Sequence, residues 1–255
     1  MNKRYLRVVR GAFVIALMTL SSCNSSNKLT SITGSKTEIN SFWDSKPNKK
    51  AITVLAPYKA KIDSIMTPVV GKSAMDMDSH RPESLLSNLI ADVLRESANI
   101  YLNETADIAV INVGGLRNNL NKGDITYGDI YEILPFENAL CLLEMKGDLV
   151  EELMKNIISV KGEGISNVKL TAKKDGTIIS CTIGGEPLDP NRIYKVATVD
   201  FLAEGNDRLF AFKDAQSKRF MPEATIRTIF LNYVQQQTKI GKEVTSQIEG
   251  RIVIN

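Results

Sequence analysis

The chain has 255 residues, with 32 Lys and Arg against 29 Asp and Glu, and a formal net charge of +3. Much of the basic excess lies at the N-terminus, where Lys3, Arg4, Arg7 and Arg10 precede every acidic residue. Without residues 1–22, the basic count falls from 32 to 28 and the net charge becomes about −1. No dense basic face remains, so the composition argues against a nucleic-acid partner.

Residues 1–22 have the pattern of a bacterial signal peptide. The apolar stretch "GAFVIALMTL" follows the basic residues and is too short to span a bilayer as a helix. It leads into "LSSC", which resembles a lipobox and ends at Cys23. We therefore predict cleavage before Cys23, lipidation of Cys23, and a location in the bacterial cell envelope with membrane attachment through the lipid alone. The alternative is an ordinary cleaved signal peptide followed by a chance cysteine.

Residues 23–50 are rich in Ser, Asn, Thr and Lys, a composition that predicts a flexible tether. Residues 51–255 then have the length of one globular domain. Cys141 and Cys181 lie far apart in this domain and show no disulfide framework, so we expect two buried thiols. A disulfide between them stays open as the alternative, since disulfides form in exported proteins.

Apolar periodicity predicts the elements of the domain in chain order. Helices are expected at 51–66, 82–101, 124–134, 147–158 and 223–236. Strands are expected within 66–74 and at 106–112, 137–145, 167–172, 177–185, 192–203 and 250–255. This order indicates an α+β fold, in which helices pack on a mixed, largely antiparallel sheet, and not a doubly wound sheet.

Polar and glycine residues follow the strand expected at 106–112. Asn112 can donate and accept hydrogen bonds, and Arg117 can hold an anion or a sugar hydroxyl. Gly114 and Gly115 allow a ligand to approach the backbone. The alternative is a strand-to-loop turn that needs glycines and leaves Arg117 on the surface.

Two later segments offer aromatic and acidic side chains. Phe136 follows Pro135, and a ring on a rigid loop can stack on a planar ligand. Asp207 lies in a polar turn after an apolar strand, with Phe210 behind it. The alternatives are a core position for Phe136 and ordinary turn chemistry for Asp207.

The sequence offers no catalytic centre of a familiar kind. Its one histidine, His80, cannot supply a site that bridges two metal ions. We find neither a G-x-S-x-G elbow nor a Walker A motif. We therefore assign no catalytic residue, no metal ligand and no cofactor to this chain, and expect His80 to cap the following helix or line a pocket.

Five collinear segments resemble the C-terminal domain of the 5'-nucleotidase and UDP-sugar hydrolase family. They are "ESLLSNLIADVL", "INVGGLR", "GDITYGDIYEILPFEN", "VDFLAEGNDRLFAF" and "EGRI". The resemblance covers about residues 50–255. In full-length members this domain binds the substrate, and a separate N-terminal metallophosphatase domain with two metal ions breaks the phosphate bond.

The resemblance implies a role for several residues. Asn112 and Arg117 match the polar contacts to the ligand, Phe136 matches the first of two rings that stack on a nucleobase, and Asp207 matches the aspartate of the second loop. Arg81 lies where the family often has a substrate-binding arginine.

This sequence departs from the family pattern in both loops. The family's Gly-Gly-Asp-Gly-Phe loop ends here in Leu209, so either the loop shifts and Phe210 supplies the second ring, or only one ring stacks on the base. Glu137 replaces a frequent glycine and would place a negative charge near a phosphate-bearing ligand.

We therefore expect the nucleoside- or nucleotide-binding half of a split 5'-nucleotidase. Its partner would be a separately encoded metallophosphatase that carries two divalent metal ions. The alternatives are a surface lipoprotein that binds nucleosides or nucleotides without hydrolysis, and an interaction scaffold.

Overall fold

The computed structural model describes residues 29–255, so the predicted signal peptide and Cys23 lie outside the described residues. The chain divides into two units, and the second begins at Thr53. A short 3₁₀ helix, η1 (Ser41–Ser45), and the helix α2 (Lys49–Met66) precede the first strand. Apolar side chains repeat along α2 as expected, yet none of its residues is buried. Among residues 29–255, no helix combines the length and apolar character needed to cross a bilayer.

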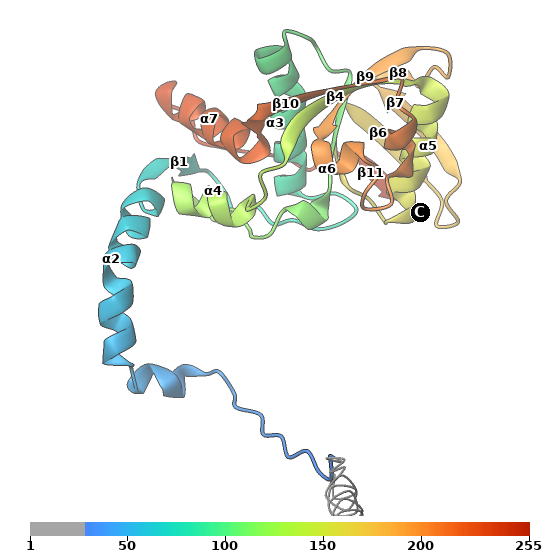
Figure 1. Ribbon diagram of the computed structural model, residues 1–255. Helices are drawn as coiled ribbons and strands as arrows, with labels where there is room; N and C mark the ends of the chain where they lie inside the picture. The colour runs from blue at the N-terminus through green and yellow to red at the C-terminus, as the bar shows by residue number, and fades with distance from the viewer. Residues whose placement is uncertain (1–28) are drawn as a thin grey trace, which may run out of the picture. The chain divides into compact units, whose positions relative to one another are not determined.

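A five-stranded sheet, in the order β10-β4-β9-β2-β5, lies at the centre of the second unit (Figure 1). Its strands are β2 (Ile108–Ile111), β4 (Ala139–Lys146), β5 (Gly164–Ser166), β9 (Ile193–Val199) and β10 (Ser217–Thr225). β2 and β9 pair in parallel, and the other neighbours pair antiparallel. Consecutive side chains of β2 and β4 are buried, so both faces of these two strands are covered.

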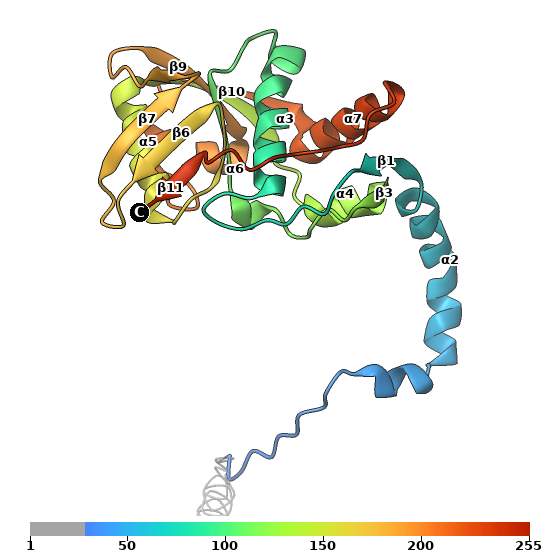
Figure 2. The ribbon, with the colours of Figure 1, turned by 180° about the vertical axis from the view of Figure 1, so that it is seen from behind.

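The longer helices pack on this sheet through apolar stripes. The helices of the second unit after α2 are α3 (Leu85–Leu102), α4 (Tyr127–Ile133), α5 (Gly147–Ser159), α6 (Asp200–Ala203) and α7 (Ile226–Lys239). α3 packs against β2, β5 and β9, while α5 packs against β4 and β9. α7 lies beside α3 in both views (Figures 1 and 2). Ser84 caps α3 and exchanges hydrogen bonds with Ser87, which fixes where this helix begins.

Two smaller sheets complete the unit. β1 (Val69–Ser73) pairs antiparallel with β3 (Gly123–Thr126). The other sheet, in the order β11-β6-β7-β8, contains β6 (Val168–Ala172), β7 (Ile178–Ile183), β8 (Glu186–Pro187) and β11 (Ile252–Ile254). β11 runs parallel to β6, which brings the C-terminal strand beside the middle of the chain (Figure 2). The predicted α+β class is confirmed, with three sheets where one was expected.

Three local predictions were wrong. The first three residues of the helix expected at 124–134 belong to β3, because they pair with β1 before α4 begins at Tyr127. The strand expected at 192–203 ends at Val199, after which α6 begins. The first residues of the helix expected at 223–236 form the end of β10, which pairs with β4 and was missed. In each case partner strands at long sequence distance decide the boundary.

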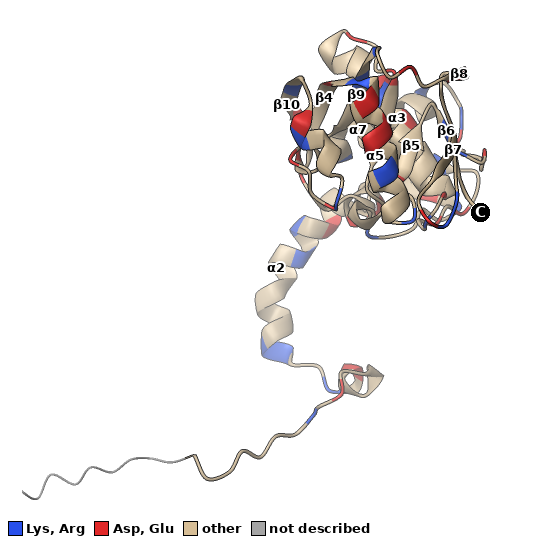
Figure 3. Cartoon of the chain, turned by 90° about the vertical axis from the view of Figure 1, so that its right-hand side faces the viewer, with Lys and Arg blue, Asp and Glu red and all other residues tan. Residues whose placement is uncertain are grey.

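Both cysteines of the second unit are free thiols. Burial raises the pKa of Cys141 to about 12 and that of Cys181 to about 11, so both thiols stay protonated near neutral pH. In the view of Figure 3 both basic and acidic segments are visible on this unit, and α5 carries more acidic than basic residues.

Candidate functional site

Asn112 lies where the buried strand β2 gives way to the 3₁₀ turn η2 (Val113–Gly115). Its side chain is 5% exposed, and its Nδ2 donates to Oδ2 of Asp207 at 2.6 Å. Its Oδ1 has no partner and is one of two such buried side-chain atoms among residues 29–255. A buried acceptor without a partner is costly in a folded protein, so this oxygen marks a place where a donor is missing.

The two glycines of η2 lie against Asn112 for different reasons. A Cβ atom on Gly115 would come within 2.8 Å of the Asn112 Oδ1, so a larger residue here would displace the amide. A Cβ atom on Gly114 would have its nearest neighbour, Oδ2 of Asp207, at 3.9 Å. Gly115 thus leaves room for the Asn112 side chain, and Gly114 lies on the open side of the turn.

Asp207 is held in a turn of left-handed backbone after α6. Gly205, Asp207 and Arg208 have φ values of 76°, 53° and 65°. The two non-glycine residues adopt a conformation that is uncommon for their type. Nδ2 of Asn206 donates to the Phe201 carbonyl oxygen at 2.7 Å, which ties this turn to the start of α6. Strained turns of this kind are frequent at binding sites.

Phe136 lies on the loop that joins α4 to β4. Its side chain is 48% exposed, so it is not the core residue that the alternative interpretation required. Phe201, in the first turn of α6, is 40% exposed. Two large aromatic side chains, one on a loop and one in α6, therefore remain partly open to solvent.

These segments surround one cavity with a volume of about 350 Å³, which we call the Asn112 cavity. Its lining residues are Asn112, Gly114, Gly115, Arg117, Phe136, Asn138, Phe201 and Asp207. Phe136 and Arg117 thus line one cavity, and Asp207 reaches it from the turn after a later strand. The geometric reason is that β2, α4 and β9 all end at this rim.

Neither Leu209 nor Phe210, the two residues at the expected position of the second ring, lines this cavity. Leu209 is fully buried, because the left-handed turn before it directs the chain back into the core. Phe210 is exposed but does not line the cavity, whereas Phe201 does. Asn138, two residues after Phe136, was also missed. The signal that could have identified Phe201 is its place directly after an apolar strand, the same argument that selected Asn112.

Arg81 does not line the cavity but supports its edge. Its guanidinium donates to the Gly162 carbonyl oxygen at 2.8 Å and pairs with the Glu163 carboxylate. Glu163 is buried and also accepts a hydrogen bond from the backbone N–H of Val113 in η2. Burial raises the pKa of Glu163 above its ordinary value, against the opposing effect of Arg81.

Glu137 does not place a free charge in the cavity. Its Oε1 accepts a hydrogen bond from Nη2 of Arg227 at 2.7 Å, and Glu137 does not line the cavity. Because the Glu137 carboxylate is paired with Arg227, the structure does not support the expectation that Glu137 places a negative charge near a phosphate-bearing ligand.

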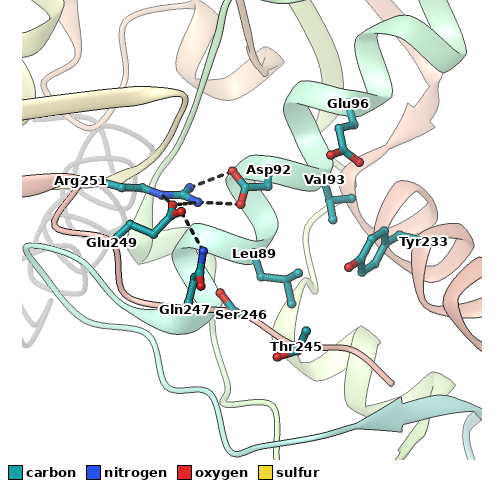
Figure 4. Close-up of a pocket in the computed structure, with 10 residues that line it drawn as sticks. All are labelled: Leu89, Asp92, Val93, Glu96, Tyr233, Thr245, Ser246, Gln247, Glu249 and Arg251. Carbon is teal, nitrogen blue, oxygen red and sulfur yellow. Dashed lines mark hydrogen bonds and ion pairs between the residues drawn. The ribbon is translucent and has the colours of Figure 1, made fainter. Parts of the chain in front are cut away.

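A second cavity, of about 400 Å³, lies between α3, α7 and the segment before β11 (Figure 4). Arg251 donates two hydrogen bonds of 2.8 and 2.7 Å to Asp92 (Figure 4). Nε of Arg251 donates a third, of 2.8 Å, to the Glu249 carboxylate. Glu83 accepts from Nδ2 of Asn88 at 2.7 Å and from the backbone N–H of Arg251 at 2.8 Å. We call these five residues the Arg251 cluster. The first and last of the five sequence motifs meet in this cluster, where the charged groups are paired with one another.

The described residues provide no place for a metal ion. No group of three or more His, Cys, Asp or Glu side chains within residues 29–255 could hold one. His80 is exposed and lies 3.7 Å from Oδ1 of Asp78. The donor set therefore does not fit the two metal ions of a metallophosphatase, and no step through a metal is assigned to this chain.

The fold and the Asn112 cavity define a small α+β domain with a ligand-sized cavity at the ends of its strands. A family model for the 5'-nucleotidase C-terminal domain matches residues 67–214, and the chain belongs to that family.

Known relatives are longer than this chain. Protein UshA of Yersinia enterocolitica is 34% identical over 166 residues, which are 61% of this chain and 29% of UshA. Apyrase of Aedes aegypti is 30% identical over 223 residues, which are 78% of this chain and 38% of the apyrase. The structure of the 5'-nucleotidase precursor from Thermus thermophilus superposes with a TM-score of 0.71 at 26% identity, covering 80% of this chain and 43% of that one. The chain thus spans well under half the length of these relatives.

Proposed function

We propose that this domain binds a nucleoside or nucleotide in the Asn112 cavity, as the binding half of an exported 5'-nucleotidase. The observation that carries the proposal is the lining of the cavity. It combines two half-exposed aromatic rings, a buried acceptor without a partner, a carboxylate and a guanidinium. These are the groups that a planar base, ribose hydroxyls and a phosphate require.

Each group has a distinct task in this proposal. Phe136 and Phe201 stack on the base, and stacking is worth about 1–3 kcal/mol per base. Oδ1 of Asn112 and the carboxylate of Asp207 accept hydrogen bonds from ligand N–H or O–H groups. Arg117, whose Nη1 donates to the Gly114 carbonyl oxygen at 3.2 Å, offers its remaining N–H groups to an anionic or hydroxyl oxygen.

The catalyst in this proposal is a separately encoded metallophosphatase with two divalent metal ions. Helix α2 supplies a surface for it, because Leu55, Tyr58, Ile62 and Ile65 recur at heptad spacing and are each more than half exposed. An apolar stripe of this kind on a soluble domain marks an interaction surface. α2 ends at Met66, immediately before the matched family domain begins.

Calorimetric titration with adenosine and AMP tests the binding step. We expect wild-type protein to bind, and Phe136→Ala and Phe201→Ala each to weaken binding by about 1–3 kcal/mol. Phe210→Ala is the matched control, since Phe210 is exposed but does not line the cavity. No binding by wild-type protein, or equal losses in all three variants, would overturn the proposed ligand.

A phosphatase assay on AMP with Mn²⁺ tests the division of labour. We expect activity when the metallophosphatase and this protein are mixed, and loss of the gain when Leu55 and Ile62 are both changed to Asp. Adenosine binding by that double variant should be unchanged. Strong activity of this chain alone would contradict the assignment of the catalyst to a partner.

The location also belongs to the proposal. Lipidation at Cys23 would hold the domain at a membrane of the cell envelope through residues 23–50. Cys23→Ser should release a folded, adenosine-binding protein into the soluble fraction. If that variant stays in the membrane fraction, the lipid is not the anchor.

A further inference from the structure

Arg227 lies in the first turn of α7, far from the cavity residues in sequence, and is 7% exposed. Thr225 caps α7 and accepts a hydrogen bond from the Thr228 N–H, which fixes the turn that carries Arg227. Nη1 of Arg227 donates to the Pro135 carbonyl oxygen at 3.1 Å, and Nη2 donates to Oε1 of Glu137 at 2.7 Å. One buried guanidinium therefore holds the residues on both sides of Phe136.

Two further contacts complete the attachment of this loop. The guanidinium carbon of Arg227 lies 4.5 Å from the ring centroid of Tyr131 in α4, a cation–π contact on the helix that leads into the loop. The backbone N–H of Ile226 donates to the carbonyl oxygen of Asn138 at 2.9 Å. The start of α7 thus holds the loop backbone at Pro135 and Asn138 and the side chain of Glu137.

We propose that Arg227 is a positioning residue, which holds Phe136 in the orientation that receives the ligand. The inference rests on the proposed function, because it names what orients one wall of the same cavity. Glu137 then acts as the counter-ion of Arg227 rather than as a group that contacts ligand. The planar fork of an arginine suits this task, since it can bond a carbonyl oxygen and a carboxylate at once.

The physical basis is preorganisation of the stacking ring. Within residues 29–255 the backbone of Phe136 makes no hydrogen bond of its own, and the bonds that hold the loop lie on the residues around it. A ring that must be ordered when the ligand arrives weakens binding by the entropy of that ordering. Without Arg227, we therefore expect adenosine to bind about two- to tenfold more weakly, with the loop itself more mobile.

The experiment compares Arg227→Met with wild-type protein in two backgrounds, one with Phe136 and one with Phe136→Ala. Adenosine affinity is measured by calorimetry, and hydrogen exchange is followed by mass spectrometry for the segment 134–140. Arg227→Lys is included because lysine keeps the charge but loses the fork, so it should give an intermediate result in both measurements. Arg219→Met is the matched control, since Arg219 lies on β10, pairs with Glu104 and does not line the cavity.

We expect Arg227→Met to weaken binding in the Phe136 background, and to change it by less than about twofold in the Phe136→Ala background. Exchange in the segment 134–140 should accelerate in Arg227→Met and stay unchanged in Arg219→Met.

Equal losses in both backgrounds would show a general structural role and overturn the inference, as would unchanged binding and exchange. If wild-type protein does not bind adenosine, the proposed function fails, and the exchange measurement alone decides whether Arg227 holds the loop. If Arg227→Met does not fold, Glu137→Gln tests the same contact from its exposed side.

Discussion

The Asn112 cavity and the Arg251 cluster are both built from motif residues, yet they differ in how far their polar groups are satisfied. In the Arg251 cluster, the guanidinium has carboxylate or carbonyl partners on all three nitrogens. In the Asn112 cavity, a buried amide oxygen has no partner and two aromatic rings stay half-exposed. A set of groups that is complete by itself stabilises the fold, whereas an unpaired acceptor beside open aromatic rings is the arrangement that the proposed ligand site requires.

This difference assigns the motifs to two tasks. The segments around Asp92 and Arg251 are far apart in sequence, and their side chains join α3 to the segment before β11. The segments around Asn112, Phe136 and Asp207 meet at strand ends, where loops can hold a ligand without disturbing the sheet. A sequence motif alone does not tell these tasks apart, since both kinds combine charged residues with amides and glycines.

The largest effect is expected in the Arg251 cluster. Arg251→Met leaves Asp92 and Glu249 without their buried partner and should lower the free energy of unfolding by about 3 kcal/mol. Urea denaturation measures this loss. Arg219→Met, which removes an exposed ion pair, should cost less than about 1 kcal/mol. Equal costs for the two variants would contradict the structural role of the cluster.

A smaller and more selective effect is expected from the same substitution in both regions. Asn88→Leu removes hydrogen bonds to Glu83 and to the Gln247 carbonyl oxygen, and should cost about 2 kcal/mol. Asn112→Leu removes an oxygen that has no partner and one hydrogen bond to the exposed carboxylate of Asp207, and should therefore cost only about 1 kcal/mol. Adenosine titration should give the reverse order, with binding lost in Asn112→Leu and kept in Asn88→Leu. A large stability loss in Asn112→Leu would show that the amide is structural.

The sequence predicted the elements well where apolar periodicity is long and local. The helices around Leu89 and Leu153 and the buried strand before Asn112 needed no distant partner to be recognised. Periodicity did not predict β10, because only one of its residues is buried and the strand is defined by its pairing with β4. An edge strand of this kind carries little apolar signal.

The candidate site was predicted to a similar extent. Asn112, Gly114, Gly115, Arg117, Phe136 and Asp207 line one cavity, as expected from strand ends and motif order. The position of the second ring was missed because the left-handed turn at Asp207 and Arg208 reverses the chain, and a motif count takes no account of that reversal. Arg227 had no signal in the sequence, since its contacts span about ninety positions along the chain.

The smallest effect separates the two regions by pH. Burial raises the pKa of Glu163, which anchors the turn beside Asn112, whereas the hydrogen bond from Arg251 lowers the pKa of Glu249. A carboxyl group with a raised pKa in the folded state stabilises the fold below its unfolded value of 4.5, and this contribution is lost as pH rises through the raised pKa. A carboxyl group with a lowered pKa contributes above 4.5 and loses its contribution as pH falls through the lowered pKa.

Urea midpoints of wild-type protein, Glu163→Gln and Glu249→Gln should be compared at pH values on both sides of 4.5. The difference between wild-type protein and Glu163→Gln should change as pH rises from that point, with wild-type protein losing stability relative to the variant. The difference for Glu249→Gln should change as pH falls, again to the disadvantage of wild-type protein, by less than about 1 kcal/mol because Glu249 is partly exposed. Identical pH dependence in the two variants would mean that Glu163 and Glu249 are in equivalent electrostatic environments. The Asn112 cavity and the Arg251 cluster would then not differ in how they shift the pKa of a carboxyl group.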